Sequence, residues 1–170
     1  MLPKAEGQFD SLMSCVLRVW GVDLNIDSLL TTSTMKPCKV YRAGEPRFPA
    51  GSRICTYSGA NFRISDADFS SLNEQVSDTL IFLEENKELL LSLRDFPGVD
   101  GVTIDFAAEI DPERYSNSFK FPNELLVSAG SLGISLELSI YSFVEDPDHP
   151  SSQAASVHAD LPPSVDTPSG

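Results

Sequence analysis

The chain has 170 residues, of which 41% are hydrophobic and 22% charged, and its formal net charge is −13. Phosphate backbones and anionic lipids repel so acidic a protein, and the charge therefore argues against general nucleic-acid binding and against membrane-surface binding. Both histidines, His149 and His158, lie in a Pro-, Ser- and Asp-rich segment near the C-terminus. The rest of the chain lacks the imidazole required for a Ser-His-Asp triad, a Cys-His nucleophile or a His-ligated zinc ion.

Composition divides the chain into three parts. Residues 145–170 contain five prolines and five acids but no Lys, Arg or aromatic residue, which predicts a disordered tail. Residues 1–9 are expected to form a flexible N-terminus, and residues 10–144 a single domain. The three cysteines form no C-x-x-C pair, and no secretory signal or apolar run of about 20 residues is visible, so we expect reduced thiols in a cytoplasmic protein.

The first half of the domain predicts short elements separated by Gly and Pro. The expected elements are a strand at 16–21 (VLRVWG), a helix at 25–30, a strand at 39–43 (KVYRA) and a strand at 53–58 (RICTYS). Asn25 or Asp27 can cap the helix, and the residues Gly44, Glu45 and Pro46 predict a turn.

The clearest helix is expected to begin near Ser71, because Ser71 and Glu74 have the spacing of a capping box. Its apolar stripe comprises Leu72, Val76, Leu80 and Leu83, with Leu90 and Leu93 after a polar break at 84–88. Asn86 lies in that break, so two helices meeting at a bend compete with one long helix. Pro97 and Gly98 end this region.

The last third contains two segments, at 102–110 and 134–141, in which apolar and polar residues alternate with the period of a half-buried strand. Between them we expect a short strand at 118–121 and a helix from Pro122 to Ala129. Together the elements predict an α+β fold with a mainly antiparallel sheet of about five or six strands and helices on one face. Strand-helix-strand order at 16–43 and again at 118–141 raises the possibility of an internal repeat.

The succession LRVWG, NIDSLL and YRAGE, followed by the Leu-rich helix and LGISLELSIY, resembles the bacterial family called domain of unknown function 4279. The resemblance covers residues 16–142 and implies a small α+β domain without an assigned reaction or cofactor. Many members carry a Trp after the GE turn, whereas this chain has Arg53-Ile-Cys-Thr-Tyr57 there.

The segment 36–63 is locally basic, with six Lys or Arg residues and one acid. The candidate binding residues in it are Arg42, Arg47, Arg53, Tyr41 and Tyr57. Arginine beside an aromatic ring suits an anionic ligand or an acidic protein surface. The alternative is internal charge balance, in which Glu84, Glu85 and Glu88 of the neighbouring helix face these bases.

Asp105, Glu109 and Glu137 occupy the polar positions of the two alternating segments. On neighbouring strands they could act as an acid and base pair if one carboxyl were kept protonated by burial. Alternation instead predicts an ordinary solvated sheet face. No P-loop, dinucleotide-binding or calcium-loop motif occurs, so no catalytic residue, metal site or cofactor is assigned.

These observations favour a non-enzymatic protein-binding module, in concrete form an acidic immunity-type protein that blocks a basic toxin, because negative charge speeds association with a basic partner. A small anionic-ligand-binding domain and a carboxylate-dependent hydrolase are the alternatives. The sequence does not determine the oligomeric state.

Overall fold

The computed structural model describes residues 14–47, 53–110 and 115–142. The strands are β1 (Cys15–Gly21), β2 (Lys39–Tyr41), β3 (Ser58–Ser65), β4 (Gly101–Ile110) and β5 (Ser135–Ser142). The helices are α1 (Ile26–Thr32), α2 (Leu72–Glu85), α3 (Lys87–Arg94) and α4 (Asn123–Ser131). Within these ranges no helix is long and apolar enough to cross a membrane. The predicted N-terminal segment 1–9 and tail 145–170 lie outside them.

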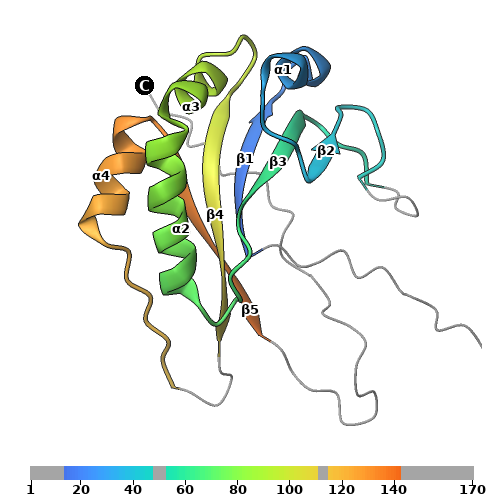
Figure 1. The fold of residues 1–170 in the computed structure, drawn as a ribbon. Helices are drawn as coiled ribbons and strands as arrows, with labels where there is room; N and C mark the ends of the chain where they lie inside the picture. The colour runs from blue at the N-terminus through green and yellow to red at the C-terminus, as the bar shows by residue number, and fades with distance from the viewer. Residues whose placement is uncertain (1–13, 48–52, 111–114, 143–170) are drawn as a thin grey trace, which may run out of the picture.

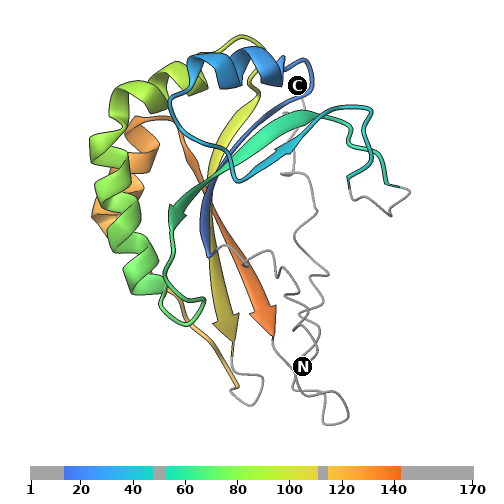
Figure 2. The same ribbon diagram turned by 45° about the vertical axis from the view of Figure 1, so that its right-hand side comes forward.

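The five strands form one sheet in the order β2-β3-β1-β4-β5. Every neighbouring pair is antiparallel except β4 and β5, which are parallel and are connected through α4. Figures 1 and 2 show that the helices lie along one face of this sheet, with α2 and α4 side by side and α1 at one end. The structure confirms an α+β fold with a mainly antiparallel sheet, and α4 supplies the crossover that a parallel pair requires.

The core lies between the sheet and the helices. Fully buried side chains come from alternate positions of the three inner strands, namely Leu17, Val19, Phe62, Ile104 and Phe106. Leu29, Leu90 and Leu125 come from α1, α3 and α4. Because side chains alternate along a strand, the residues between these core positions lie on the opposite face of the sheet.

The Leu-rich region consists of two helices that meet at Asn86, which decides between the two alternatives that the polar break left open. Val76 and Leu83 are buried, whereas Leu72 and Leu80 are only partly buried against the core. The predicted capping box is wrong, because the Ser71 side chain makes no capping hydrogen bond. Asn25 does cap α1, since its side-chain oxygen accepts from the backbone N–H of Ser28.

Two predicted strands are wrong. Residues 53–57 contain only an isolated bridge between Ile54 and Pro46, and the strand β3 runs from Ser58 to Ser65 instead. Gly59 suggested a strand boundary but lies inside β3. Residues 118–121 form no strand, and the second unit of the expected internal repeat therefore lacks its first strand.

Leu83 provides a test of the helix face. Replacing this buried residue with Ala should lower the free energy of unfolding by about 2 to 5 kcal/mol, because truncation leaves a cavity beneath α2. The neighbouring Glu84 is exposed, so Glu84→Ala should change stability by less than about 0.5 kcal/mol. Urea denaturation of the two variants gives both values, and equal losses would contradict the observed orientation of α2.

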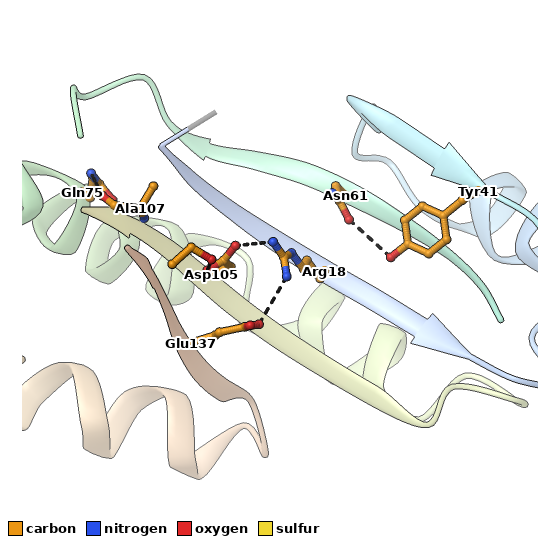
Figure 3. Close-up of polar contacts among 8 residues, drawn as sticks. Arg18, Tyr41, Asn61, Gln75, Asp105, Ala107 and Glu137 are labelled. Carbon is orange, nitrogen blue, oxygen red and sulfur yellow. Dashed lines mark hydrogen bonds and ion pairs between the residues drawn. The ribbon is translucent and has the colours of Figure 1, made fainter. Parts of the chain in front are cut away.

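A buried glutamine binds the backbone of β4 next to Phe106, the last residue of β4 in register with β1. The Gln75 side-chain amide donates to the backbone carbonyl oxygen of Ala107 at 2.8 Å and to that of Asp68 at 3.0 Å. Its side-chain oxygen accepts from the N–H of Ala107 at 3.3 Å. Gln75, shown with Ala107 in Figure 3, therefore satisfies the buried Ala107 carbonyl, whereas the Ala107 N–H also donates to the Ser14 carbonyl at 2.6 Å.

Candidate functional site

The face of the sheet opposite the helices carries the candidate site, and we call it the open face. Its central side chains are Val16, Arg18 and Trp20 of β1, Tyr41 of β2, Asn61 of β3, Thr103 and Asp105 of β4, and Glu137 and Ser139 of β5. In the register of the sheet Arg18 lies between Asn61 and Thr103, and Asp105 lies beside Glu137. No helix in the described ranges covers this face (Figure 2).

Arg18 joins two carboxylates at the centre of the open face. Its Nη2 pairs with Asp105, and its Nη1 donates to Glu137 Oε2 at 3.3 Å (Figure 3). The other Asp105 oxygen accepts from the Ser139 hydroxyl at 2.8 Å. The two acids differ in environment, because the Asp105 side chain is 6% exposed and that of Glu137 is 42% exposed.

Burial raises the pKa of the Asp105 carboxyl to about 6, although Arg18 and the Ser139 hydroxyl act in the opposite direction. At neutral pH the carboxylate is therefore ionised and paired with Arg18. The sequence predicted a solvated sheet face for Asp105, and that prediction is wrong. Neighbouring side chains, here Arg18 and Ser139, can cover a short residue that alternation places opposite the core.

Three aromatic rings lie together at one end of the open face. Tyr57 contacts Trp20 and Tyr41 edge-on, with ring centroids 5.7 and 5.5 Å apart. The Trp20 indole lies against Gly101, where an added Cβ would be 2.7 Å from Nε1, and Tyr41 lies against Gly59. Among the described residues no acceptor pairs with the buried indole N–H. The two glycines thus allow large rings to lie flat on the strands.

The structure brings some of the five predicted binding residues together and directs Arg42 elsewhere. Tyr41 and Tyr57 belong to the aromatic group, and the backbone N–H of Arg47 donates to the carbonyl of Arg53 at 2.9 Å in the loop between β2 and β3. Arg42 instead pairs with Asp27 of α1 at 2.6 Å.

The basic segment also makes different ion pairs from those proposed under internal charge balance. Arg42 pairs with Asp27, and Arg63 pairs with Asp66 at 2.6 Å. Both acids lie close to the segment in sequence, on α1 and just after β3, rather than on α2 or α3. Arg42 therefore pairs with Asp27 of α1 rather than with Glu84, Glu85 or Glu88.

Sequence reasoning did not assign Arg18 and Trp20 to the site. A signal was present, since Arg18 interrupts an otherwise apolar strand and a charged residue at such a position needs a partner. The identity of that partner depends on the strand order, which places β4 beside β1 and β5 beside β4.

Cys15 is a core residue rather than a nucleophile. It is fully buried, and its sulfur lies 3.4 Å from the Thr79 hydroxyl oxygen. Burial raises the pKa of this thiol to about 12, so its reactive thiolate form is scarce at neutral pH. Across residues 14–47, 53–110 and 115–142, no group of three or more His, Cys, Asp or Glu side chains is placed to hold a metal ion.

Comparison with known proteins gives one family. The family model described as "Domain of unknown function (DUF4279)" matches residues 11–143, which include all the described strands and helices. No curated protein and no solved structure matches the chain.

Proposed function

The chain belongs to the DUF4279 family, and we propose that this member is a non-enzymatic protein-binding module whose recognition surface is the open face. One observation carries the proposal: Trp20, Tyr41 and Arg18 lie together on a sheet face that no described helix covers. Trp, Tyr and Arg are the residue types that contribute most to binding at protein interfaces.

The concrete form of the proposal is a cytoplasmic immunity-type protein that binds and blocks a basic toxin. The net charge of −13 attracts a basic partner from a distance and speeds the encounter. At short range, Glu137 presents a partly exposed carboxylate next to the Arg18 and Asp105 pair. A Lys or Arg of the partner that binds there is paired with the Glu137 carboxylate, so binding does not bury an unpaired charge.

Capture of a partner from the native cell, followed by calorimetric titration with the purified partner, tests this proposal. Glu137→Gln should weaken binding by about tenfold or more, equivalent to about 1.4 kcal/mol. The control is Glu124→Gln, which removes the same charge from exposed α4 on the other side of the molecule and should leave the dissociation rate unchanged. A loss with Glu124→Gln but not with Glu137→Gln would place the interface on the helices and contradict the proposal.

Charge reversal of Arg42 and Arg47 tests the anionic-ligand alternative. If the protein binds an anion through Arg42, Arg47 and Arg53, the charge-reversed variant should lose that binding. If the partner is a basic toxin, the variant should bind it with unchanged affinity or with a faster association rate. An anion at Arg42 must also compete with Asp27, which already pairs with this guanidinium.

A carboxylate-dependent hydrolase is the second candidate function. Asp105, with its raised pKa, and the more exposed Glu137 are two acids in different environments, as acid and base catalysis requires. Turnover of a substrate by the purified protein, abolished by both Asp105→Asn and Glu137→Gln in the absence of any partner, would overturn the non-enzymatic proposal.

A further inference from the structure

The two edges of the sheet differ in how well they are protected from pairing with a further strand. At one edge, β2 has only three residues and begins with Lys39, and both features discourage pairing. At the other edge, β5 runs for eight residues, SLELSIYS, with no Lys, Arg or Pro. Its register with β4 is continuous from Ser135 to Ser142, so no bulge interrupts the strand. Of the two edges, β5 is therefore the one suited to continue the sheet.

The outer side of β5 offers backbone groups to a further strand. From Ser135 to Ile140, no residue in the described ranges forms a backbone hydrogen bond with that side of the strand. Along a strand, the N–H and C=O groups of alternate residues point to opposite sides, so every second residue of β5 presents both groups outward. An additional strand can satisfy this row of groups.

Apolar side chains are exposed on β5 and on the helix next to it. Ile140 of β5 is 51% exposed, and Leu126 and Val127 of α4 are 50% and 70% exposed. The helix α4 packs against β5 and lies beyond α2, at the outside of the helix layer (Figure 1). These two elements thus carry three of the seven large hydrophobic side chains that are exposed in the described ranges. Exposed apolar side chains beside a strand edge indicate a surface that binds another protein.

A second copy of β5 complements this edge in one antiparallel register, with Leu138 opposite its own counterpart. On the helix side of the sheet, Leu136 then lies opposite Ile140 of the second copy, so all three apolar side chains face apolar partners. On the open face, Glu137 lies opposite Ser139. Sliding the strands by two residues in one direction places the two Glu137 carboxylates opposite each other, which is destabilising. Sliding them in the other direction places Leu136 opposite a serine.

We propose that two copies of this chain associate through β5, paired antiparallel about Leu138, so that their two sheets become one. The two-fold axis is perpendicular to the sheet, and both open faces therefore lie on the same side. The remaining edges are the two protected β2 strands, so the assembly stops at two copies. This inference does not depend on what the open face binds.

Net charge opposes the association of two copies, because each chain carries −13. Salt screens this repulsion, since the Debye length falls from about 10 Å at 0.1 M to about 3 Å at 1 M. The dissociation constant of the dimer should therefore decrease with added salt, whereas that of a complex with a basic toxin should increase. These opposite salt dependences separate a failure of this inference from a failure of the proposed function.

Sedimentation velocity of the full-length protein tests the association. At a concentration of about 0.1 mM, the wild type should sediment as a particle of twice the chain mass of 18.5 kDa. Ile140→Lys places a charge opposite Leu136 of the second copy and should raise the dissociation constant by about tenfold or more. The matched control is Ile81→Lys on α2, where the side chain is 57% exposed, and it should leave the dissociation constant unchanged.

Disulfide trapping tests the register. Directly opposite residues of an antiparallel pair have Cα atoms about 4.5 to 5.5 Å apart, a separation that a disulfide spans. In a Cys38→Ser background, which removes the exposed thiol, Leu138→Cys should form a cross-linked dimer under mild oxidation. Ser135→Cys should not, because the two copies of residue 135 lie about 20 Å apart along the paired strands. The reduced variants should keep the circular dichroism spectrum of the wild type.

Three outcomes would overturn the inference. The wild type could stay monomeric at both low and high salt. Ile140→Lys and Ile81→Lys could weaken the dimer equally, which would place the interface elsewhere. Cross-linking could be as efficient at residue 135 as at residue 138, which would exclude pairing about Leu138.

Discussion

Arg18→Ala should lower the free energy of unfolding by about 3 to 5 kcal/mol at pH 7.5, because it leaves the buried Asp105 carboxylate without its cationic partner. Glu137→Gln breaks the other contact of the same guanidinium but should cost no more than about 1 kcal/mol, since Glu137 is substantially exposed. Urea denaturation of both variants gives the free energy of unfolding lost with the buried Arg18–Asp105 pair and with the more exposed Arg18–Glu137 pair.

The loss caused by Arg18→Ala should depend on pH. The folded-state pKa of Asp105 is raised from 3.8 to about 6, so the folded protein binds this proton more tightly than the unfolded chain. The contribution of Asp105 to stability is therefore fully present below about pH 4 and is lost as the pH rises through about 6. Removing Arg18 raises this pKa further, and the variant should consequently regain stability on acidification from pH 7.5 to pH 5.

Arg18→Ala combined with Asp105→Asn is the control for that interpretation. The double variant has no carboxyl to ionise at this position, so it should be more stable than Arg18→Ala at pH 7.5, by a margin that narrows at pH 5 and closes only below about pH 4. If the two proteins have the same stability at both pH values, the cost of Arg18→Ala comes from lost packing of its side chain rather than from an unpaired charge.

The strands predicted from alternation are the most accurate part of the fold. The segments 102–110 and 134–141 correspond closely in extent to β4 and β5. The expected half-buried character is wrong for β4, because its residues from Val102 to Ala108 are buried on both faces. The pairing of these two strands was not predictable from that pattern. Their parallel orientation follows from the crossover through α4, a long-range feature that alternation does not encode.

The strand boundary predicted at Gly59 is wrong, because the role of this glycine depends on tertiary packing. Gly59 follows the predicted strand at 53–58 and suggested its end, but its missing side chain instead makes room for Tyr41 within β3. Signals within a short sequence window favour a strand boundary, and the contact that favours a continuing strand comes from a different element.

The candidate site was only partly predictable for the same reason. Tyr41 and Tyr57 were selected from their position among basic residues, and they do contact each other. The ion cluster involves three strands whose residues are separated by 87 and 119 positions in sequence. Neither the burial of Asp105 nor its pairing with Arg18 can be deduced without the strand order.

Gln75 presents a similar case, because a polar residue within the α2 sequence gives no indication that it is fully buried. Gln75→Leu should lower the free energy of unfolding by roughly 1 to 3 kcal/mol despite the added apolar surface. The substitution leaves the buried carbonyl of Ala107 without the side-chain amide, whereas the Asp68 carbonyl still accepts from the backbone N–H of Ser71 at 2.9 Å.

Thr79→Val is the matched control on the same buried side of α2. The Thr79 hydroxyl donates to the Gln75 backbone carbonyl at 2.7 Å, but this residue lies inside the helix, where the backbone N–H four residues later can still bond that carbonyl. Thr79→Val should therefore cost less than about 1.5 kcal/mol. Thermal and urea unfolding of the two variants would show whether Gln75 satisfies the buried Ala107 carbonyl. A loss no larger for Gln75→Leu than for Thr79→Val would mean that the end of β4 is satisfied by other groups.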